Sequence, residues 1–181
     1  MTTVISMLRG VNVGGHNLIK METLRALYES IELRDPQTYV QSGNVIFKTE
    51  ERNLARLVMR IEVAIERRFG IRTTVIMRTS SEMKGVIARN PFASRRDIDP
   101  RKLLVLFLAS DPSQEARNNL LQMKADPEEL RIGERELYIY YPNGMARPKL
   151  SPALMEKTLK IRATGRNWNS VTKLLETAER L

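Results

Sequence analysis

Residues 38–48 read TYVQSGNVIFK and contain two β-prone runs with a turn between them. The first run covers residues 38–41 and the second covers residues 45–48. The intervening Ser42-Gly43-Asn44 is typical of a turn, because glycine adopts the positive φ that a tight hairpin requires. This stretch therefore predicts a β-hairpin.

Helical segments are predicted on both sides of this hairpin. Four apolar residues before it recur at helical spacing: Met21, Leu24, Leu27 and Ile31. After it, an apolar stripe runs through residues 54–69 and stops at Gly70, a typical helix C-terminus. Buried strands are expected at residues 4–8 and 73–77. The resulting order of strand, helix, strand, strand, helix and strand is that of a ferredoxin-like plait.

The rest of the chain repeats much of this pattern. A short helix at residues 80–89 and a polar link precede strands at residues 103–108, 130–132 and 137–141, with a helix after the first strand. Two helices, at residues 152–160 and about 167–181, then follow, as though a helix replaced the closing strand of a second plait. We therefore predict an α+β fold in which a ferredoxin-like βαββαβ half, residues 1–78, packs with a second, similar α+β half, residues 79–181, that ends in helices. The halves form either two domains or one compact unit.

Composition excludes several classes of protein. Of the 181 residues 42% are hydrophobic and 28% are charged, which is typical of a globular chain rather than a disordered one. The absence of cysteine excludes disulfides, thiolate nucleophiles and iron-sulfur clusters, and the only histidine is His16. No metal site and no cofactor are predicted. The longest apolar run, residues 103–109, is far shorter than the roughly 20 residues of a membrane span, and no targeting segment is recognised. We expect a cytoplasmic protein that does not bind membranes.

Positive charge is concentrated near the carboxyl end. The formal net charge is +9, and residues 147–173 hold seven cations and the single anion Glu156. Such an excess favours phosphates or another polyanion as a partner. A solvated basic surface without a partner is the alternative interpretation.

Four polar segments are candidates for a binding site. They are the glycine-rich loop at residues 9–17, the hairpin tip at 41–44, the loop at 143–149 and the start of the last helix at 164–170. Glycines free backbone amides to surround an anion, and the amino end of a helix adds a favourable dipole. Loop, turn and N-cap structure alone is the alternative interpretation of each segment.

The candidate ligand residues divide by chemical role. Arginine and lysine supply charge, asparagine and glutamine orient the ligand, and glycine allows close approach of the backbone. The set is Arg9, Asn12, Gly14, Gly15, Gln41, Asn44, Arg147, Lys149, Arg166, Asn167 and Asn169. His16 is a candidate general acid or base, but no Ser-His-Asp arrangement can be assembled from the spacing, so no catalytic residue is assigned.

The same segments carry a family resemblance. They read LRGVNVGG at residues 8–15, TYVQSGNVIF at residues 38–47 and RNWNSVTKL at residues 166–174. In these segments the chain resembles the uncharacterised, mainly bacterial proteins of the domain of unknown function 1697 family. The resemblance implies an α+β fold built of ferredoxin-like units, and it implies no established activity.

The residues favour one function and leave three alternatives open. We expect a phosphate-bearing small molecule to bind at one composite polar site. The first alternative is a nucleic-acid-binding module that uses the basic segment at residues 147–173. The second is an enzyme acting on a phosphorylated metabolite, with His16 or a carboxylate as base. The third is an interaction protein, as a monomer or as a homodimer formed through an edge strand.

Overall fold

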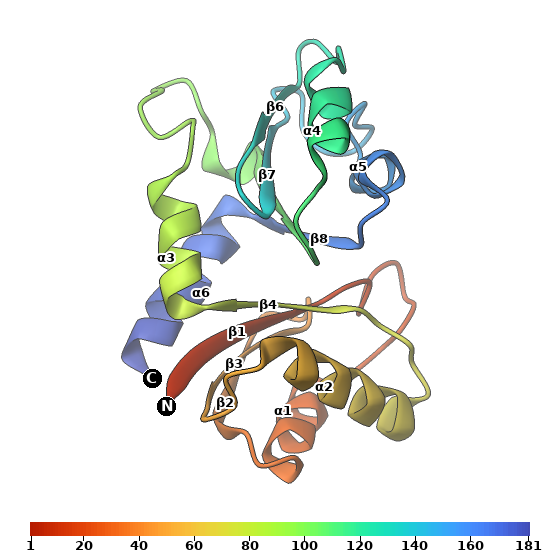
Figure 1. Ribbon diagram of the computed structural model, residues 1–181, viewed down its shortest axis with the longest axis vertical. Helices are drawn as coiled ribbons and strands as arrows, with labels where there is room; N and C mark the ends of the chain where they lie inside the picture. Colours follow the sequence, from red (N-terminus) through yellow and green to blue (C-terminus); the bar gives the residue numbers. More distant parts are fainter. The chain divides into compact units, whose positions relative to one another are not determined.

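The computed structural model describes residues Met1–Leu181, and the chain forms two compact units. Unit 1 comprises Met1–Lys84 and Lys173–Leu181, and unit 2 comprises Gly85–Thr172. Each unit contains one four-stranded antiparallel sheet (Figure 1). No helix combines the length and the apolar character that crossing a bilayer would need.

Unit 1 has the predicted order of strand, helix, strand, strand, helix, strand. Its elements are β1 (Thr2–Leu8), α1 (Met21–Ser30), β2 (Arg34–Tyr39), β3 (Asn44–Thr49), α2 (Leu54–Phe69) and β4 (Val75–Thr79). The strands lie in the order β2-β3-β1-β4. Both helices cover the same face of this sheet (Figure 1). The ferredoxin-like arrangement predicted for the first half is therefore confirmed.

The core of unit 1 follows from the alternation of side chains along β1. Val4 and Leu8 face the helices and pack in one cluster with Leu57 and Ile61 of α2. Ser6 lies between them on the same face, and its hydroxyl is 2.8 Å from the hydroxyl of Tyr28. Burial of this tyrosine raises its pKa above the ordinary value of 10.0. The hydrogen bond thus satisfies the one polar group that α1 places in the core.

The ends of α2 explain why this helix is evident from sequence. The side chain of Asn53 accepts a hydrogen bond of 3.0 Å from the backbone N–H of Arg56 and so caps the amino end. At the other end Gly70 adopts a left-handed conformation with φ 68°, as predicted.

Unit 2 repeats the topology of unit 1. After α3 (Ser80–Ala88) and a 3₁₀ turn at Pro100–Lys102 come β5 (Leu103–Leu108), α4 (Gln114–Leu121), β6 (Glu129–Ile132), β7 (Glu136–Tyr140), α5 (Pro152–Leu159) and β8 (Ala163–Asn167). The helix α6 (Trp168–Arg180) follows β8, and α3 and α6 each belong partly to unit 1 and partly to unit 2. The strands lie in the order β6-β7-β5-β8, and α4 and α5 cover one face of the sheet (Figure 1).

One prediction for this half is wrong. No helix replaces the closing strand, because Ala163–Asn167 forms β8 and pairs antiparallel with β5. The sequence of β8, ATGRN, lacks the alternation of apolar residues that marks a strand. Its pairing with β5 and the close packing of Gly165 on Leu104, where an added Cβ would lie 3.1 Å from Leu104 Cδ1, determine its conformation instead. Tertiary pairing therefore outweighs the local pattern.

Candidate functional site

The candidate ligand residues fall in both units. Six lie in unit 1 and five lie in unit 2, and each group is described within its own unit. The unit 1 group is Arg9, Asn12, Gly14, Gly15, Gln41 and Asn44; the unit 2 group is Arg147, Lys149, Arg166, Asn167 and Asn169. That the two groups form one composite site stays a prediction.

Unit 1 brings the glycine-rich loop and the hairpin tip together through Asn12. Its side-chain amide donates hydrogen bonds of 2.9 Å to the Ile19 carbonyl and 2.7 Å to the Gln41 carbonyl. Its side-chain oxygen accepts a bond of 2.8 Å from the Ile19 N–H. Gly14 and Gly15, at the exposed end of the loop, both have positive φ. The loop is thus held at its base, and its glycines are exposed.

The hairpin tip is held just as closely. Asn44 is fully buried, and its side-chain amide donates to the Tyr39 carbonyl at 3.1 Å and to the Ser42 hydroxyl at 2.8 Å. Gly43 has a φ of 72°, and a Cβ there would lie 2.9 Å from Leu8 Cβ. Glycine is therefore required at this position by both conformation and space.

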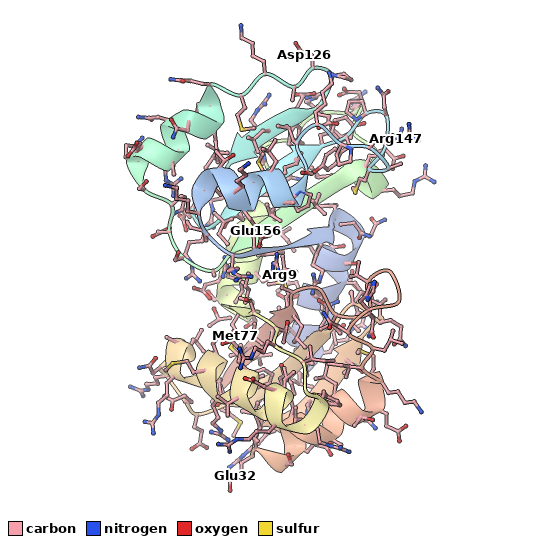
Figure 2. All side chains as sticks on the ribbon, turned by 90° about the vertical axis from the view of Figure 1, so that its right-hand side faces the viewer. Arg9, Glu32, Met77, Asp126, Arg147 and Glu156 are labelled. Atoms are coloured by element: carbon pink, nitrogen blue, oxygen red, sulfur yellow. The ribbon has the colours of Figure 1, made fainter.

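The loop between β7 and α5 carries two exposed cations in unit 2. Lys149 donates its ammonium to the Asp126 carbonyl at 2.5 Å and its backbone N–H to Glu128 at 2.8 Å. The labelled Asp126 and Arg147 lie in neighbouring loops of this unit (Figure 2). Arg147 is exposed and forms no ion pair, so its guanidinium is available to an anion.

The residues around the start of α6 differ in accessibility. Arg166 is only 7% exposed, and its guanidinium donates to the Thr164 hydroxyl and the Gly165 carbonyl, each at 2.8 Å. Burial lowers the pKa of Arg166 to about 10, which leaves it protonated at neutral pH. Asn167 accepts a hydrogen bond of 2.8 Å from the Ser170 N–H and so caps the amino end of α6. Asn169 is exposed.

A second cationic feature of unit 2 lies at the carboxyl end of α5. Here a pocket of about 390 Å³ is lined by Ala153, Glu156, Lys157, Lys160, Ile161 and Arg162, and we call it the α5 pocket. Its three cations are exposed, and none of them forms an ion pair. Glu156 accepts a hydrogen bond of 2.7 Å from the Ala163 N–H. The pocket therefore combines three available cations with a carboxylate that binds the backbone.

Only part of this pocket can be predicted from the sequence. Lys157, Lys160 and Arg162 belong to the basic segment, but they are not among the candidate ligand residues. They converge because Lys160 ends α5 in a left-handed conformation with φ 55°, a turn more typical of glycine or asparagine. Nothing in the residue pattern predicts that turn.

Two antiparallel α+β units with ferredoxin-like topology define the structural class of this protein. The family model described as "Protein of unknown function (DUF1697)" matches residues 1–138, and the chain belongs to this family. The predicted family is thereby confirmed, and its description names no activity. No curated protein matches the chain.

A solved structure has the same fold. The conserved bacterial protein SP0830 from Streptococcus pneumoniae is 21% identical, with a TM-score of 0.74 over 98% of this chain and 98% of that chain. At this identity the similarity establishes the fold alone. Function therefore has to be argued from the residues of this chain.

Proposed function

We propose that the protein binds a phosphate-bearing small molecule in the α5 pocket. The observation that carries this proposal is the convergence of Lys157, Lys160 and Arg162 on one pocket with no acidic partner. Many cations elsewhere in the chain are paired, for example Arg95 with Glu129 at 2.7 Å and Arg101 with Asp99 at 2.9 Å. Other exposed cations, for example Arg56 and Arg67 of α2, also form no ion pair, so the proposal rests on the pocket that these three cations line together.

The charge balance of the α5 pocket favours an anion. The carboxyl end of a helix contributes roughly half a negative charge, and Glu156 contributes one more. Three full positive charges outweigh both. The Ala163 N–H also hydrogen-bonds the Glu156 carboxylate, which reduces its competition for the cations. A dianionic phosphate therefore suits the pocket better than a monoanion.

The chemistry of the cations suits phosphate in particular. The Arg162 guanidinium can donate two parallel hydrogen bonds to one phosphate, and the lysines add point charges. A volume of about 390 Å³ is in the range of small-molecule pockets. Single-stranded nucleic acids usually need aromatic side chains for stacking, and none of the large hydrophobic residues that are exposed is aromatic. These features favour a small ligand over a nucleic acid.

Thermal unfolding with a ligand panel tests this proposal. The panel holds inorganic phosphate, pyrophosphate, a nucleoside monophosphate, a sugar phosphate and short RNA and DNA, at low salt and at physiological salt. A ligand at a hundredfold its dissociation constant stabilises the fold by about 2.7 kcal/mol. We expect at least one small phosphate to raise the midpoint at physiological salt.

Matched variants locate the effect. Arg162→Gln and Lys160→Gly each remove one charge from the α5 pocket, whereas Arg25→Gln removes one from an exposed position on α1. Both pocket variants should lose most of the ligand-induced shift, and Arg25→Gln should keep it. A shift that all polyanions share and that salt abolishes would contradict the proposal and favour nucleic-acid binding. So would a shift that both pocket variants retain.

A further inference from the structure

The helix α1 presents carboxylates that have no partner. Glu22 and Glu29 lie on its solvent side and Glu32 follows its end, and all three are exposed. Their carboxylates form no ion pair and accept no hydrogen bond. Arg25 is the only cation of this helix and is also unpaired. α1 therefore has an acidic outer side in a chain whose net charge is +9.

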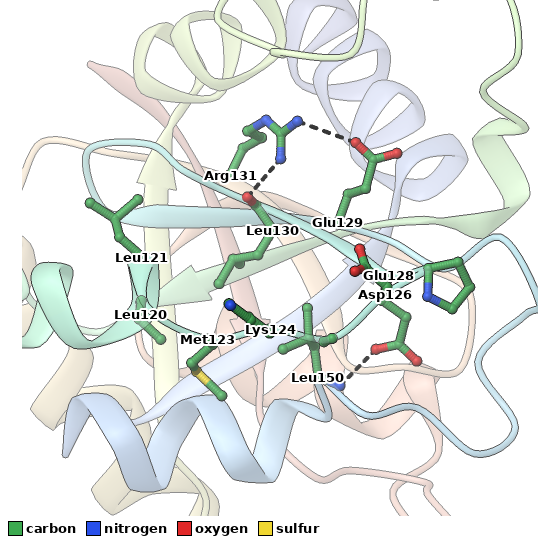
Figure 3. Close-up of a pocket in the computed structure, with 12 residues that line it drawn as sticks. Leu120, Leu121, Met123, Lys124, Asp126, Glu128, Glu129, Leu130, Arg131 and Leu150 are labelled. Atoms are coloured by element: carbon green, nitrogen blue, oxygen red, sulfur yellow. Dashed lines mark hydrogen bonds and ion pairs between the residues drawn. The ribbon is translucent and has the colours of Figure 1, made fainter.

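Carboxylates elsewhere in the chain mostly have partners. Figure 3 shows two of them in unit 2, where Glu129 accepts a hydrogen bond of 3.2 Å from the Arg131 guanidinium. Glu128 accepts a bond of 2.7 Å from the Leu150 N–H. Since cations are in excess, three neighbouring carboxylates without a partner are a local property of α1.

The helix α2 has an outer side of the opposite charge. It presents Arg56, Met59, Val63 and Arg67 at spacings of three and four residues. Neither arginine forms an ion pair. Met59 is 60% exposed and Val63 is 45% exposed, which is unusual for large apolar side chains of this chain. The outer side of α2 thus combines free positive charge with exposed apolar surface.

The acidic residues of α2 do not neutralise these arginines. Glu62 is half-buried and accepts a hydrogen bond of 2.8 Å from the Val75 N–H. Glu66 forms an ion pair of 2.6 Å with Arg72. The outer side of α2 is therefore basic.

The two helices lie side by side on the same face of the unit 1 sheet (Figure 1). The Arg60 guanidinium of α2 donates a hydrogen bond to the Ile31 carbonyl at the end of α1. An acidic strip and a basic, apolar strip are thus neighbours on one surface. We call this surface the helical face, and it consists of Glu22, Ala26, Glu29 and Glu32 beside Arg56, Met59, Val63 and Arg67.

We propose that the helical face binds a second copy of the chain and so forms a symmetric homodimer. In a twofold dimer each contact occurs twice, and an axis parallel to the helices places α1 of each copy on α2 of the other. The carboxylates of α1 then face the arginines of α2, and Met59 and Val63 lie against Ala26 of the partner subunit. An axis across the helices would place α1 on α1, and like charges would repel.

A second copy fits the helical face better than a polyanion does. A nucleic acid or an anionic lipid surface would meet the arginines of α2 but also the unpaired carboxylates of α1. A partner that satisfies both strips must carry both charges in the reverse order, and the helical face of a second copy does so. The Debye length at physiological salt is about 8 Å, so the net charge of the two copies opposes this contact only weakly.

The size of the helical face suits a weak dimer. At 1.5 Å per residue, the 16 residues of α2 span about 24 Å and the 10 residues of α1 about 15 Å, and each helix is about 10 Å wide. Two such faces bury on the order of 1,000 Å² in total, which is at the lower end of specific interfaces. We therefore expect a dissociation constant in the micromolar range.

Two charge-reversed proteins test the proposal. One carries Glu22→Lys and Glu29→Lys, and the other carries Arg56→Glu and Arg67→Glu. Each should self-associate at least about tenfold more weakly than the wild type, because both strips now have the same sign. General repulsion cannot explain this result for the second protein, since its net charge is lower than that of the wild type. An equimolar mixture should form a heterodimer, in which opposite charges face each other again.

Sedimentation velocity across the micromolar range, at physiological salt, measures these associations in the full chain. The control protein carries Glu115→Lys and Arg147→Glu, which reverse an exposed acid and an exposed cation of unit 2, and it should dimerise as the wild type does. The proposal is overturned if the wild type is monomeric throughout this range or if either charge-reversed protein dimerises as tightly as the wild type. It is also overturned if the mixture associates no more tightly than its components.

Discussion

The side-chain amide of Asn12 donates a hydrogen bond of 2.7 Å to the carbonyl of Gln41 and so joins the glycine-rich loop to the hairpin tip. The same side chain donates to and accepts from Ile19, at 2.9 and 2.8 Å. Three short hydrogen bonds on one amide give Asn12 a structural role, whatever the exposed glycines of the loop bind.

We therefore predict that Asn12→Ala lowers the free energy of unfolding by about 2–3 kcal/mol, because three backbone groups, two of them in part-buried hydrogen bonds, lose their partner and alanine must adopt a positive φ. Urea denaturation measures this change. Asn12→Gly is the control, since it removes the same bonds but tolerates the φ of 55°. It should be less destabilising by about 1 kcal/mol. Equal losses below 0.5 kcal/mol would show that the bonds contribute little.

Gly43 and Gly70 form a matched pair for separating conformation from crowding. Both have positive φ, of 72° and 68°, but an added Cβ would lie 2.9 Å from Leu8 Cβ at Gly43 and would meet nothing within 4 Å at Gly70. Gly70→Ala should cost about 1 kcal/mol from conformation alone. Gly43→Ala should cost at least about 1 kcal/mol more, because overpacking adds to that cost. Similar denaturation midpoints for the two variants would refute the predicted crowding.

Replacing Lys160 should stabilise the fold. This residue has a φ of 55° at the C-cap of α5, where glycine has no steric penalty. We expect Lys160→Gly to raise the free energy of unfolding by about 0.5–1 kcal/mol in urea. A loss of ligand binding in Lys160→Gly would then not result from unfolding of the protein. A clear destabilisation would mean that the lysine side chain contributes packing at this turn.

The buried tyrosines should make the folded protein less stable at high pH. Burial raises the pKa of Tyr28 above its ordinary value of 10.0, and the pKa values of Tyr138 and Tyr141 are raised in the same way. The folded chain therefore keeps its phenols neutral at a pH where the unfolded chain ionises them. Stability should be independent of these groups below pH 9 and should fall above pH 10, by about 1.4 kcal/mol per pH unit for each such tyrosine.

Urea midpoints measured between pH 8 and pH 11 check this dependence. Tyr28→Phe removes one ionisable group from the core and should make the decline above pH 10 shallower, although it also removes the hydrogen bond to Ser6. An unchanged slope in this variant would mean that Tyr28 ionises in the folded chain.

The sequence predicts most of the fold because, in unit 1, the apolar periodicity and the turn residues indicate the same helices and strands. The stripe of α2, the cap at Gly70 and the turn at Gly43 each have a local cause that is readable in the residues. β8 was missed because its conformation comes from pairing with β5 and not from its own residues. Propensity carries little information for such a strand.

The candidate site is less predictable for a related reason. Residue types identify Arg147 and Asn12 as polar loop residues, but they do not reveal that Asn12 binds three backbone groups or that Arg147 remains unpaired. The α5 pocket depends on the left-handed turn at Lys160, which is a property of the folded chain.

The most direct test of the proposed function is a titration of the ¹⁵N-labelled protein with pyrophosphate at physiological salt, followed by NMR. If phosphate binds in the α5 pocket, the backbone amides of residues 156–163 show saturable shifts, and these shifts are smaller or absent in Arg162→Gln. Shifts confined to other residues, or no saturable shift with pyrophosphate or with any small phosphate of the panel, would contradict the proposed function.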